Sequence, residues 1–201
     1  MREIYKSGVT PQQKIVAINN KFGNNSIKDQ QGTSRIIYDT LLPAAGQTNF
    51  RFFEDSASRT FPLTNTGSEG NKLGVGDTMV MAQLLFSVVY FNTTTNNWEG
   101  QQNLLTLNDV YCLSYCNVEI AKNQVIKKLT LSESEQDFSK DTLTVANTID
   151  LETSIVIPPL LPFVVELQLP TALSTTPPFI RQYIQCQIIG VGGIIAPRTT
   201  F

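Results

Sequence analysis

The residues from Thr78 to Asn92 form a long, mainly apolar run that constrains the fold more than any other part of the sequence. The run is too short to cross a bilayer, for which about 20 consecutive apolar residues are needed, and it leads into the polar tract 92–97. Periodicity alone does not separate a buried strand from a buried helix. The β-branched and aromatic residues of the run, with turn residues at both of its ends, favour a strand. We therefore predict a strand that enters an exposed turn.

Several other segments alternate between apolar and polar residues or form short apolar runs between turn residues, which is typical of strands. Two of them flank Ala121 to Gln124 and predict a hairpin. Proline lacks an amide donor, so the prolines beside the apolar runs in the second half of the chain are expected to mark strand ends. The predicted strands are residues 50–53, 78–92, 109–120, 125–131, 142–146, 155–157, 163–169 and 180–188.

About eight strands without a convincing amphipathic helix predict an all-β fold. The composition agrees, because only 16% of the residues are charged, against about 25% in typical soluble domains, and Thr, Val and Ile suit a pleated sheet. Residues 1–46 show no sustained period and contain two short apolar pieces, at 14–18 and 35–38. We predict a single jelly-roll-like antiparallel β-sandwich over residues 47–201, preceded by an extended N-terminal arm over residues 1–46.

Charge is unevenly distributed along the chain. The net charge of -2 gives no global attraction to nucleic acid or to an anionic membrane. Within residues 1–40, however, basic side chains outnumber acidic ones. Nucleic-acid-binding arms usually carry dense blocks of Lys and Arg, whereas scattered cations also serve to keep a segment soluble. Contact between this arm and nucleic acid is therefore only a weak prediction, and no transmembrane segment is expected.

The chain contains no histidine. This excludes Ser-His-Asp and Cys-His nucleophile systems as well as histidine-based acid–base catalysis near neutral pH. The carboxylate pairs Glu54/Asp55 and Glu133/Glu135 sit in or beside polar loops, where such pairs are usually solvated surface groups. We predict that the protein is not an enzyme; catalysis by carboxylates alone is the remaining enzymatic alternative.

The three cysteines are expected to be buried thiols made in a reducing compartment. On one strand, Cys112 and Cys116 would lie about 13 Å apart, beyond the roughly 7 Å that a disulfide spans. Structural zinc needs four ligands, and only Cys186 remains to join them. We expect neither metal nor cofactor. The glycine-rich residues 190–193 precede no helix, so they predict a β-bulge or a bend before a last strand rather than a phosphate-binding turn.

Three aromatic residues are candidates for an interface or ligand contact, while the other aromatics between Phe50 and Phe91 are expected to pack between the sheets. Trp98 follows the polar turn, where a lone tryptophan can anchor an interface or a sugar ring. Tyr111 and Tyr115 share one face of a predicted strand whose two faces are both partly apolar. One face is expected to meet the core and the other a neighbour. We assign no catalytic, cofactor or metal-binding residue.

Three blocks of the sequence carry a resemblance to a known class of proteins. They are residues 51–65, which read Arg-Phe-Phe-Glu-Asp-Ser-Ala-Ser-Arg-Thr-Phe-Pro-Leu-Thr-Asn, residues 71–77 and residues 187–198. These blocks resemble segments of bacteriophage virion structural proteins. The resemblance implies a jelly-roll capsid or vertex subunit, synthesised in the host cytoplasm and located in the virion, with an amino-terminal arm running beneath neighbouring subunits. Its partners would be copies of itself and other virion proteins. The arm is less basic than in many genome-binding coats.

Two classes of function follow from these observations. The leading hypothesis is a virion structural protein that self-assembles, or docks on an assembled shell, through strand faces and an extended arm. The alternative is a lectin-like, spike or decoration β-sandwich that binds a host glycan or receptor near Trp98 and the turn 92–97.

Overall fold

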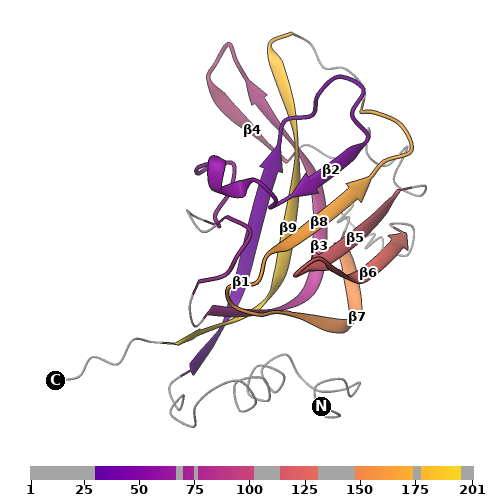
Figure 1. Ribbon diagram of the computed structural model, residues 1–201. Helices are drawn as coiled ribbons and strands as arrows, with labels where there is room; N and C mark the ends of the chain where they lie inside the picture. Colours follow the sequence, from indigo (N-terminus) through magenta and orange to yellow (C-terminus); the bar gives the residue numbers. More distant parts are fainter. Residues whose placement is uncertain are drawn as a thin grey trace, which may run out of the picture.

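The computed structural model describes residues 30–66, 70–74, 77–101, 114–130, 148–173 and 178–195. These residues form two antiparallel sheets that pack face to face as a sandwich (Figure 1). One short 3-10 turn, η1 (Ser56–Ser58), lies outside the sheets. The strands are β1 (Gln30–Leu41), β2 (Asn49–Phe52), β3 (Asp77–Asn92), β4 (Asn97–Gln101), β5 (Tyr115–Ile120), β6 (Asn123–Thr130), β7 (Thr148–Ile157), β8 (Phe163–Gln168) and β9 (Ile180–Ile195). The all-β prediction is confirmed.

The strands pair in a nested pattern that defines how the chain is rolled up. Strand β5 pairs with β6, β3 with β7, β2 with β8, and β1 with β9, each antiparallel. Further pairs join β9 to β3 and β5 to β8, so the sheets have the orders β1-β9-β3-β7 and β2-β8-β5-β6. This rolled ribbon of eight strands is the connectivity of a jelly roll. Strand β4 is an addition that forms a hairpin with the end of β3.

The predicted boundary between arm and sandwich is placed too late in the chain. Gln30–Leu41, inside the expected arm, is a strand whose twelve residues all pair with β9 at the edge of the five-stranded sheet. Sequence reasoning found only the apolar piece at 35–38, because the first residues of this strand are polar or glycine and owe their strand conformation to pairing with a distant segment. Residues 1–29 of the expected arm lie outside the described part of the chain.

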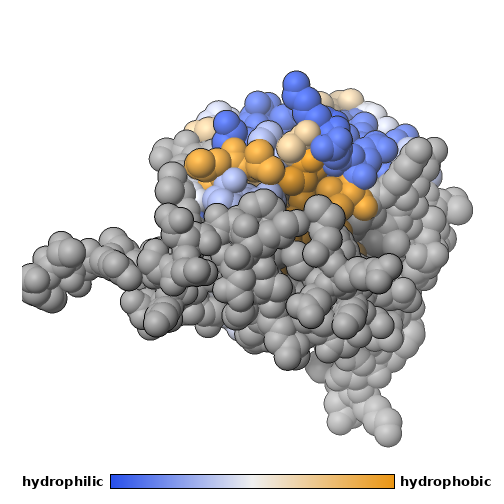
Figure 2. Space-filling view, turned by 60° about the horizontal axis from the view of Figure 1, so that its bottom comes forward, coloured by the Kyte–Doolittle hydropathy of each residue, from blue (hydrophilic) through white to orange (hydrophobic). Residues whose placement is uncertain are grey.

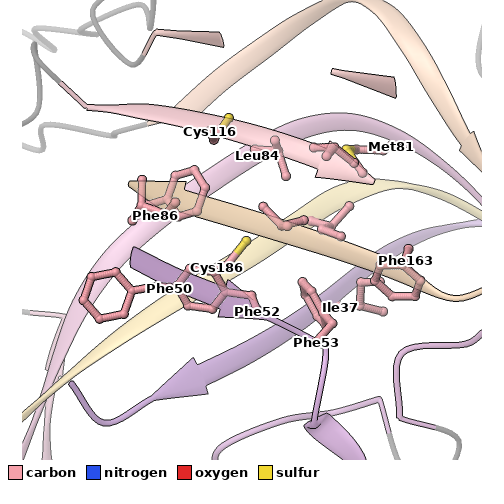
Figure 3. Packing of buried hydrophobic residues seen from close by; sticks show 14 of the residues in the cluster. Ile37, Phe50, Phe52, Phe53, Met81, Leu84, Phe86, Cys116, Phe163 and Cys186 are labelled. Atoms are coloured by element: carbon pink, nitrogen blue, oxygen red, sulfur yellow. The ribbon is translucent and has the colours of Figure 1, made fainter. Parts of the chain in front are cut away.

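Large apolar side chains from both sheets fill the space between them (Figure 3). Phe50 and Phe52 point inward from β2, and the Phe52 ring lies 5.9 Å from the ring of Phe86 on the opposite sheet. Full burial of such a side chain stabilises the fold by about 1.5–3 kcal/mol. The predicted alternation in the last strand is confirmed, because Ile184, Cys186 and Ile188 are all buried in this core.

Strand β9 runs without interruption across the glycine-rich residues 190–193. The expected bulge or bend before a last strand is therefore wrong, and the irregularity lies in the neighbouring strand: the register of β3 against β9 shifts between Met81 and Gln83. At this point the strands approach so closely that a Cβ atom on Gly190 would lie 1.9 Å from the carbonyl oxygen of Val80. Only glycine fits here, and it allows β9 to pair along its length with β3.

The predicted hairpin at Ala121 is confirmed, with a tighter turn than expected. Ala121 and Lys122 connect β5 to β6 and have φ angles of 50° and 66°. Positive φ at both central residues is the signature of a type I′ turn, whose twist matches that of the flanking strands. Neither residue is the Asn or Gly that this turn prefers, which explains why the sequence placed the turn only within residues 121–124. The Ala121 amide donates to the carbonyl of Pro162 and ties the turn to the β7–β8 connection.

Substitution of Gly190 tests the close approach of β3 and β9. We expect Gly190→Ala to lower the free energy of unfolding by about 2–3 kcal/mol, because overpacking forces the two backbones apart. Urea denaturation measures the effect. Gly46→Ala is the matched control: its Cβ would meet nothing within 4 Å, although its φ of +76° disfavours alanine, so a loss of only about 1 kcal/mol is expected. Equal losses in the two variants would contradict the proposed constraint.

Candidate interaction surfaces

Three aromatic side chains form a ladder on the outer face of the five-stranded sheet, near the β3–β4 hairpin. Phe91 of β3 pairs directly with Trp98 of β4, and their ring centroids are 5.0 Å apart. The Trp98 ring in turn lies 5.1 Å from that of Tyr183 in β9. Val88 and Ile184, which alternate with these residues, are buried in the core. The aromatic ladder thus stands on the side of the sheet that faces away from the core.

The part of this outer face that β1, β3 and β9 form is almost uncharged among its described side chains. Ile36 of β1 is 50% exposed, and Leu85, Val89 and Ile189 are half-buried. Between them the amide of Gln187 donates to Gln185, which donates to Thr40 at 3.1 Å. Among the described outward side chains of β1, β3 and β9, only Arg181 carries a charge. These side chains form a surface of apolar and amide groups with one charged side chain at its end. Such a surface is better suited to contact with another protein than to contact with water.

The outer face of the four-stranded sheet has the opposite character. The Glu166 carboxylate on β8 accepts hydrogen bonds from the amides of Asn117 (2.9 Å) and Asn49 (2.7 Å). Arg51 pairs with Glu54 at 2.8 Å and with Glu119 at 3.5 Å. The hydrogen bond from Asn117, followed by that from Asn49 and the charge of Arg51, lowers the pKa of Glu166 despite partial desolvation. The hydrogen bond to Glu54 raises the pKa of Arg51. These polar groups satisfy one another at the solvent boundary.

The structure does not bring the three predicted contact residues together. Trp98 belongs to the aromatic ladder on one outer face, whereas Tyr115 lies on the other, where its hydroxyl donates to Gln168. Tyr111 lies outside the described residues. The contacts of Trp98 with other aromatic rings were not predicted. Phe91 was expected in the core, whereas the alternation of the segment that contains Tyr183 had placed that ring on the face opposite to Ile184 and Cys186.

A buried ion pair fixes the loop between β2 and β3 to the edge of the sandwich. Asp39 of β1 is completely buried, and its two carboxylate oxygens accept bonds from Arg59 at 2.9 and 2.6 Å. The same carboxylate accepts the backbone amide of Phe53 at 2.6 Å, which holds Phe53 at a φ of +70°. A bidentate Arg–carboxylate pair is directional as well as strong. The start of the loop is therefore held in one geometry.

The far side of the same loop is tied to the free edge of β1. The Asn65 side chain accepts the Tyr38 amide at 2.7 Å and donates to the Ile36 carbonyl at 2.8 Å. The Thr64 hydroxyl donates to the Tyr38 carbonyl at 2.9 Å. These contacts occupy edge groups that another strand would otherwise pair with. Between the two anchors, Phe61 projects with 81% of its surface exposed.

Exposed apolar residues also gather at the connection between β7 and β8, which runs toward the lower end of Figure 1. Leu160 is 54% and Leu161 is 41% exposed. This connection is held from two sides: the Leu160 amide donates to the carbonyl of Leu73, and the Ala121 amide donates to that of Pro162, at 2.9 and 2.8 Å. The view from below shows apolar residues beside a cap of hydrophilic ones (Figure 2).

The described residues offer little catalytic chemistry. No group of three or more potential metal-binding side chains occurs among them. Within the candidate carboxylate pairs, Glu54 is engaged by Arg51 and both it and Asp55 are exposed, while Glu133 and Glu135 lie outside the described residues. Cys116 and Cys186 are free, buried thiols, as predicted; Cys112 falls in a part of the chain that the structure does not describe.

No protein-family model matches the chain, and no curated protein or solved structure matches it significantly. Within the described part of the chain, no helix has the length and apolar character needed to cross a membrane.

Removal of the buried carboxylate tests its role in anchoring the loop. We expect Asp39→Ala to lower the free energy of unfolding by about 3–5 kcal/mol, because Arg59 loses its partner in a largely buried position. Urea denaturation gives the value, and Asp39→Asn, which keeps an acceptor for the Phe53 amide, serves if the alanine variant does not fold. The control Arg51→Ala breaks a solvent-exposed pair, for which about 0–1 kcal/mol is expected. Similar losses at both sites would argue against the anchor.

The buried thiols provide a second test of the core. Desolvation raises the pKa of Cys116 to about 12, and desolvation followed by the charges of Cys116 and Asp39 raises that of Cys186. In a Cys112→Ser background, we expect neither thiol to be alkylated at about pH 8 until the protein is unfolded in urea. Above the unfolded thiol pKa of about 9, stability should fall with rising pH by up to about 1.4 kcal/mol per pH unit for each thiol, because only the unfolded state ionises. Rapid alkylation of the folded protein would contradict this burial.

Proposed function

We propose that this chain is a structural subunit of a virion that assembles with copies of itself, as a capsid or vertex protein of a bacteriophage. The observation that carries the proposal is the contrast between the two outer faces of the sandwich. One face is covered by hydrogen-bonded charges around Glu166 and Arg51. The other presents the aromatic ladder and aliphatic side chains, and Arg181 is the one charge among the described outward side chains of β1, β3 and β9.

Physical chemistry favours assembly through the uncharged face. Burial of apolar surface contributes about 25 cal/mol per Å², whereas burial of a charged network would cost free energy unless every ion kept its partners. Half-buried residues such as Leu85, Val89 and Ile189 project from long paired strands, so little conformational entropy is lost when they are covered. A rigid sheet face of this kind is suited to packing against a neighbouring subunit.

The block resemblance supports the virion assignment, and the jelly-roll connectivity is compatible with it, since this fold occurs in viral capsids as well as in lectins. Under this proposal the partners are further copies of the chain and other virion proteins, and the protein is made in the host cytoplasm before it enters the virion. The extended arm of residues 1–29 beneath neighbouring subunits stays a prediction. So does its weak contact with nucleic acid.

A second candidate is a glycan- or receptor-binding sandwich. The observation in its favour is the position of Trp98 beside the turn 93–96, where aromatic rings and polar side chains occur together. Both neighbours of the Trp98 ring are already aromatic, however, which reduces the surface on which a sugar could stack. We therefore rank this function below assembly.

A matched pair of charge substitutions tests the proposal. Ile36→Glu places a carboxylate on the uncharged face at a residue that is 50% exposed, so the subunit itself should fold normally. Burial of an unpaired charge at an interface is costly, and we expect the protein concentration needed for assembly to rise more than about tenfold, equivalent to about 1.4 kcal/mol. Mass photometry and electron microscopy measure the assembled fraction.

The control for this experiment is Val125→Glu. Val125 is 48% exposed, on strand β6 at the edge of the other sheet, and its substitution should leave assembly unchanged. Ile36→Glu that assembles like the unmodified protein would refute assembly through this face. If the unmodified protein is instead a stable monomer that binds a glycan array, and Trp98→Ala abolishes that binding, the second candidate replaces the first.

A further inference from the structure

Phe61 stands out from the other exposed apolar residues by the way in which it is held. It is 81% exposed, the largest value among the exposed large apolar residues of the described chain. Its loop is nevertheless anchored on both sides, by the Arg59–Asp39 ion pair before it and by the Thr64 and Asn65 bonds to β1 after it. The amide of Leu63 also donates to the carbonyl of Thr60 across the tip at 2.9 Å. An aromatic side chain held in place on an anchored loop is typical of a binding hot spot rather than of an ordinary exposed turn.

A second pair of exposed apolar side chains lies on the connection between β7 and β8. Leu160 and Leu161 are exposed on a connection that is itself hydrogen-bonded to segment 70–74 and to the β5–β6 turn. Segment 70–74 also reaches the other element, because a Cβ atom on Gly70 would lie 3.0 Å from the Cβ of Ala57 in η1. The η1 turn that precedes Phe61 and the connection that carries the leucine pair therefore both contact segment 70–74.

Charge distinguishes the two elements. Asp55, at the start of the η1 turn that precedes Phe61, is exposed. Lys72 neighbours Leu73, which accepts the Leu160 amide, and Lys122 neighbours Ala121, which bonds to Pro162; both lysines are exposed. The aromatic loop thus carries an acidic group, whereas Lys122 lies beside the connection that carries the leucine pair. Lys72 lies on the segment that contacts both elements. Such complementarity favours contact between unlike elements and disfavours contact of each element with itself.

We propose that Phe61 of one subunit packs against Leu160 and Leu161 of a second copy of this chain, with Asp55 placed toward Lys122. A two-fold axis between the two copies would allow each subunit to donate its Phe61 and to receive that of its neighbour. The anchored loop loses little freedom when it binds, so most of the free energy gained on burial of the ring is retained. This inference rests on the proposed self-assembly and adds a contact separate from the uncharged sheet face.

Site-specific photocrosslinking tests the contact directly. Phe61 is replaced by the photoreactive residue p-benzoylphenylalanine, the full-length protein is irradiated, and crosslinked peptides are identified by mass spectrometry. We expect a covalent dimer whose crosslink maps to residues 159–162 of the other copy. The matched control carries the same replacement at Phe179, another exposed phenylalanine, next to the β3–β4 turn; it should give no crosslink to residues 159–162.

Charge exchange provides the second arm of the experiment. In the photoreactive protein, Lys122→Asp should lower the dimer yield at least severalfold, and the combination of Lys122→Asp with Asp55→Lys should restore part of it. If the irradiated protein still assembles but contains no covalent dimer, this contact is overturned and the proposed function stands. Crosslinks that map elsewhere would have the same consequence. If the unmodified protein never self-associates, both proposals fail.

Discussion

The pairing of β9 with both β1 and β3 is the constraint on which the rest of the structure depends. This strand, the last one described, pairs along its length with β3 and with the first strand, β1. The close approach at Gly190, where the backbone of β3 leaves no room for a side chain, allows the ladder to continue past the register shift. Once β9 is in place, β1 becomes the sheet edge to which the loop with Phe61 is tied.

The two outer faces of the sandwich differ in chemistry, although both are formed by antiparallel strands. On the four-stranded sheet, ions and amides saturate one another, so any partner that covered them would have to replace bonds already made. On the five-stranded sheet, the aromatic ladder and its aliphatic neighbours have no comparable hydration to lose. The alternation of side chains along β3 and β9 therefore determines which outer face favours association.

Local sequence patterns were sufficient to predict the strands that have a clear apolar run, a regular alternation or flanking prolines. The apolar run at Thr78–Asn92, the alternation after Ile180 and the prolines around Phe163 predicted β3, β9 and β8. Strand β1 was predicted only in part and β4 was missed, because their residues are largely polar or glycine and adopt strand conformation by pairing with distant segments. Trp98 was identified as a surface residue by its position after a turn. Its aromatic partners depend on strand register, which no local pattern reveals.

The Asp39–Arg59 pair shows why the most specific feature of the loop is hidden from the sequence. Nothing in the spacing of these residues distinguishes them from solvated charges, and only the fold places the carboxylate inside the core with the Phe53 amide on one of its oxygens. A buried ion pair of this kind contributes more to conformational specificity than to net stability, because the cost of desolvation offsets much of its attraction. Here the specificity acts on the loop: two anchored ends give Phe61 one defined position at the surface, and a side chain with a defined position can recognise a defined partner.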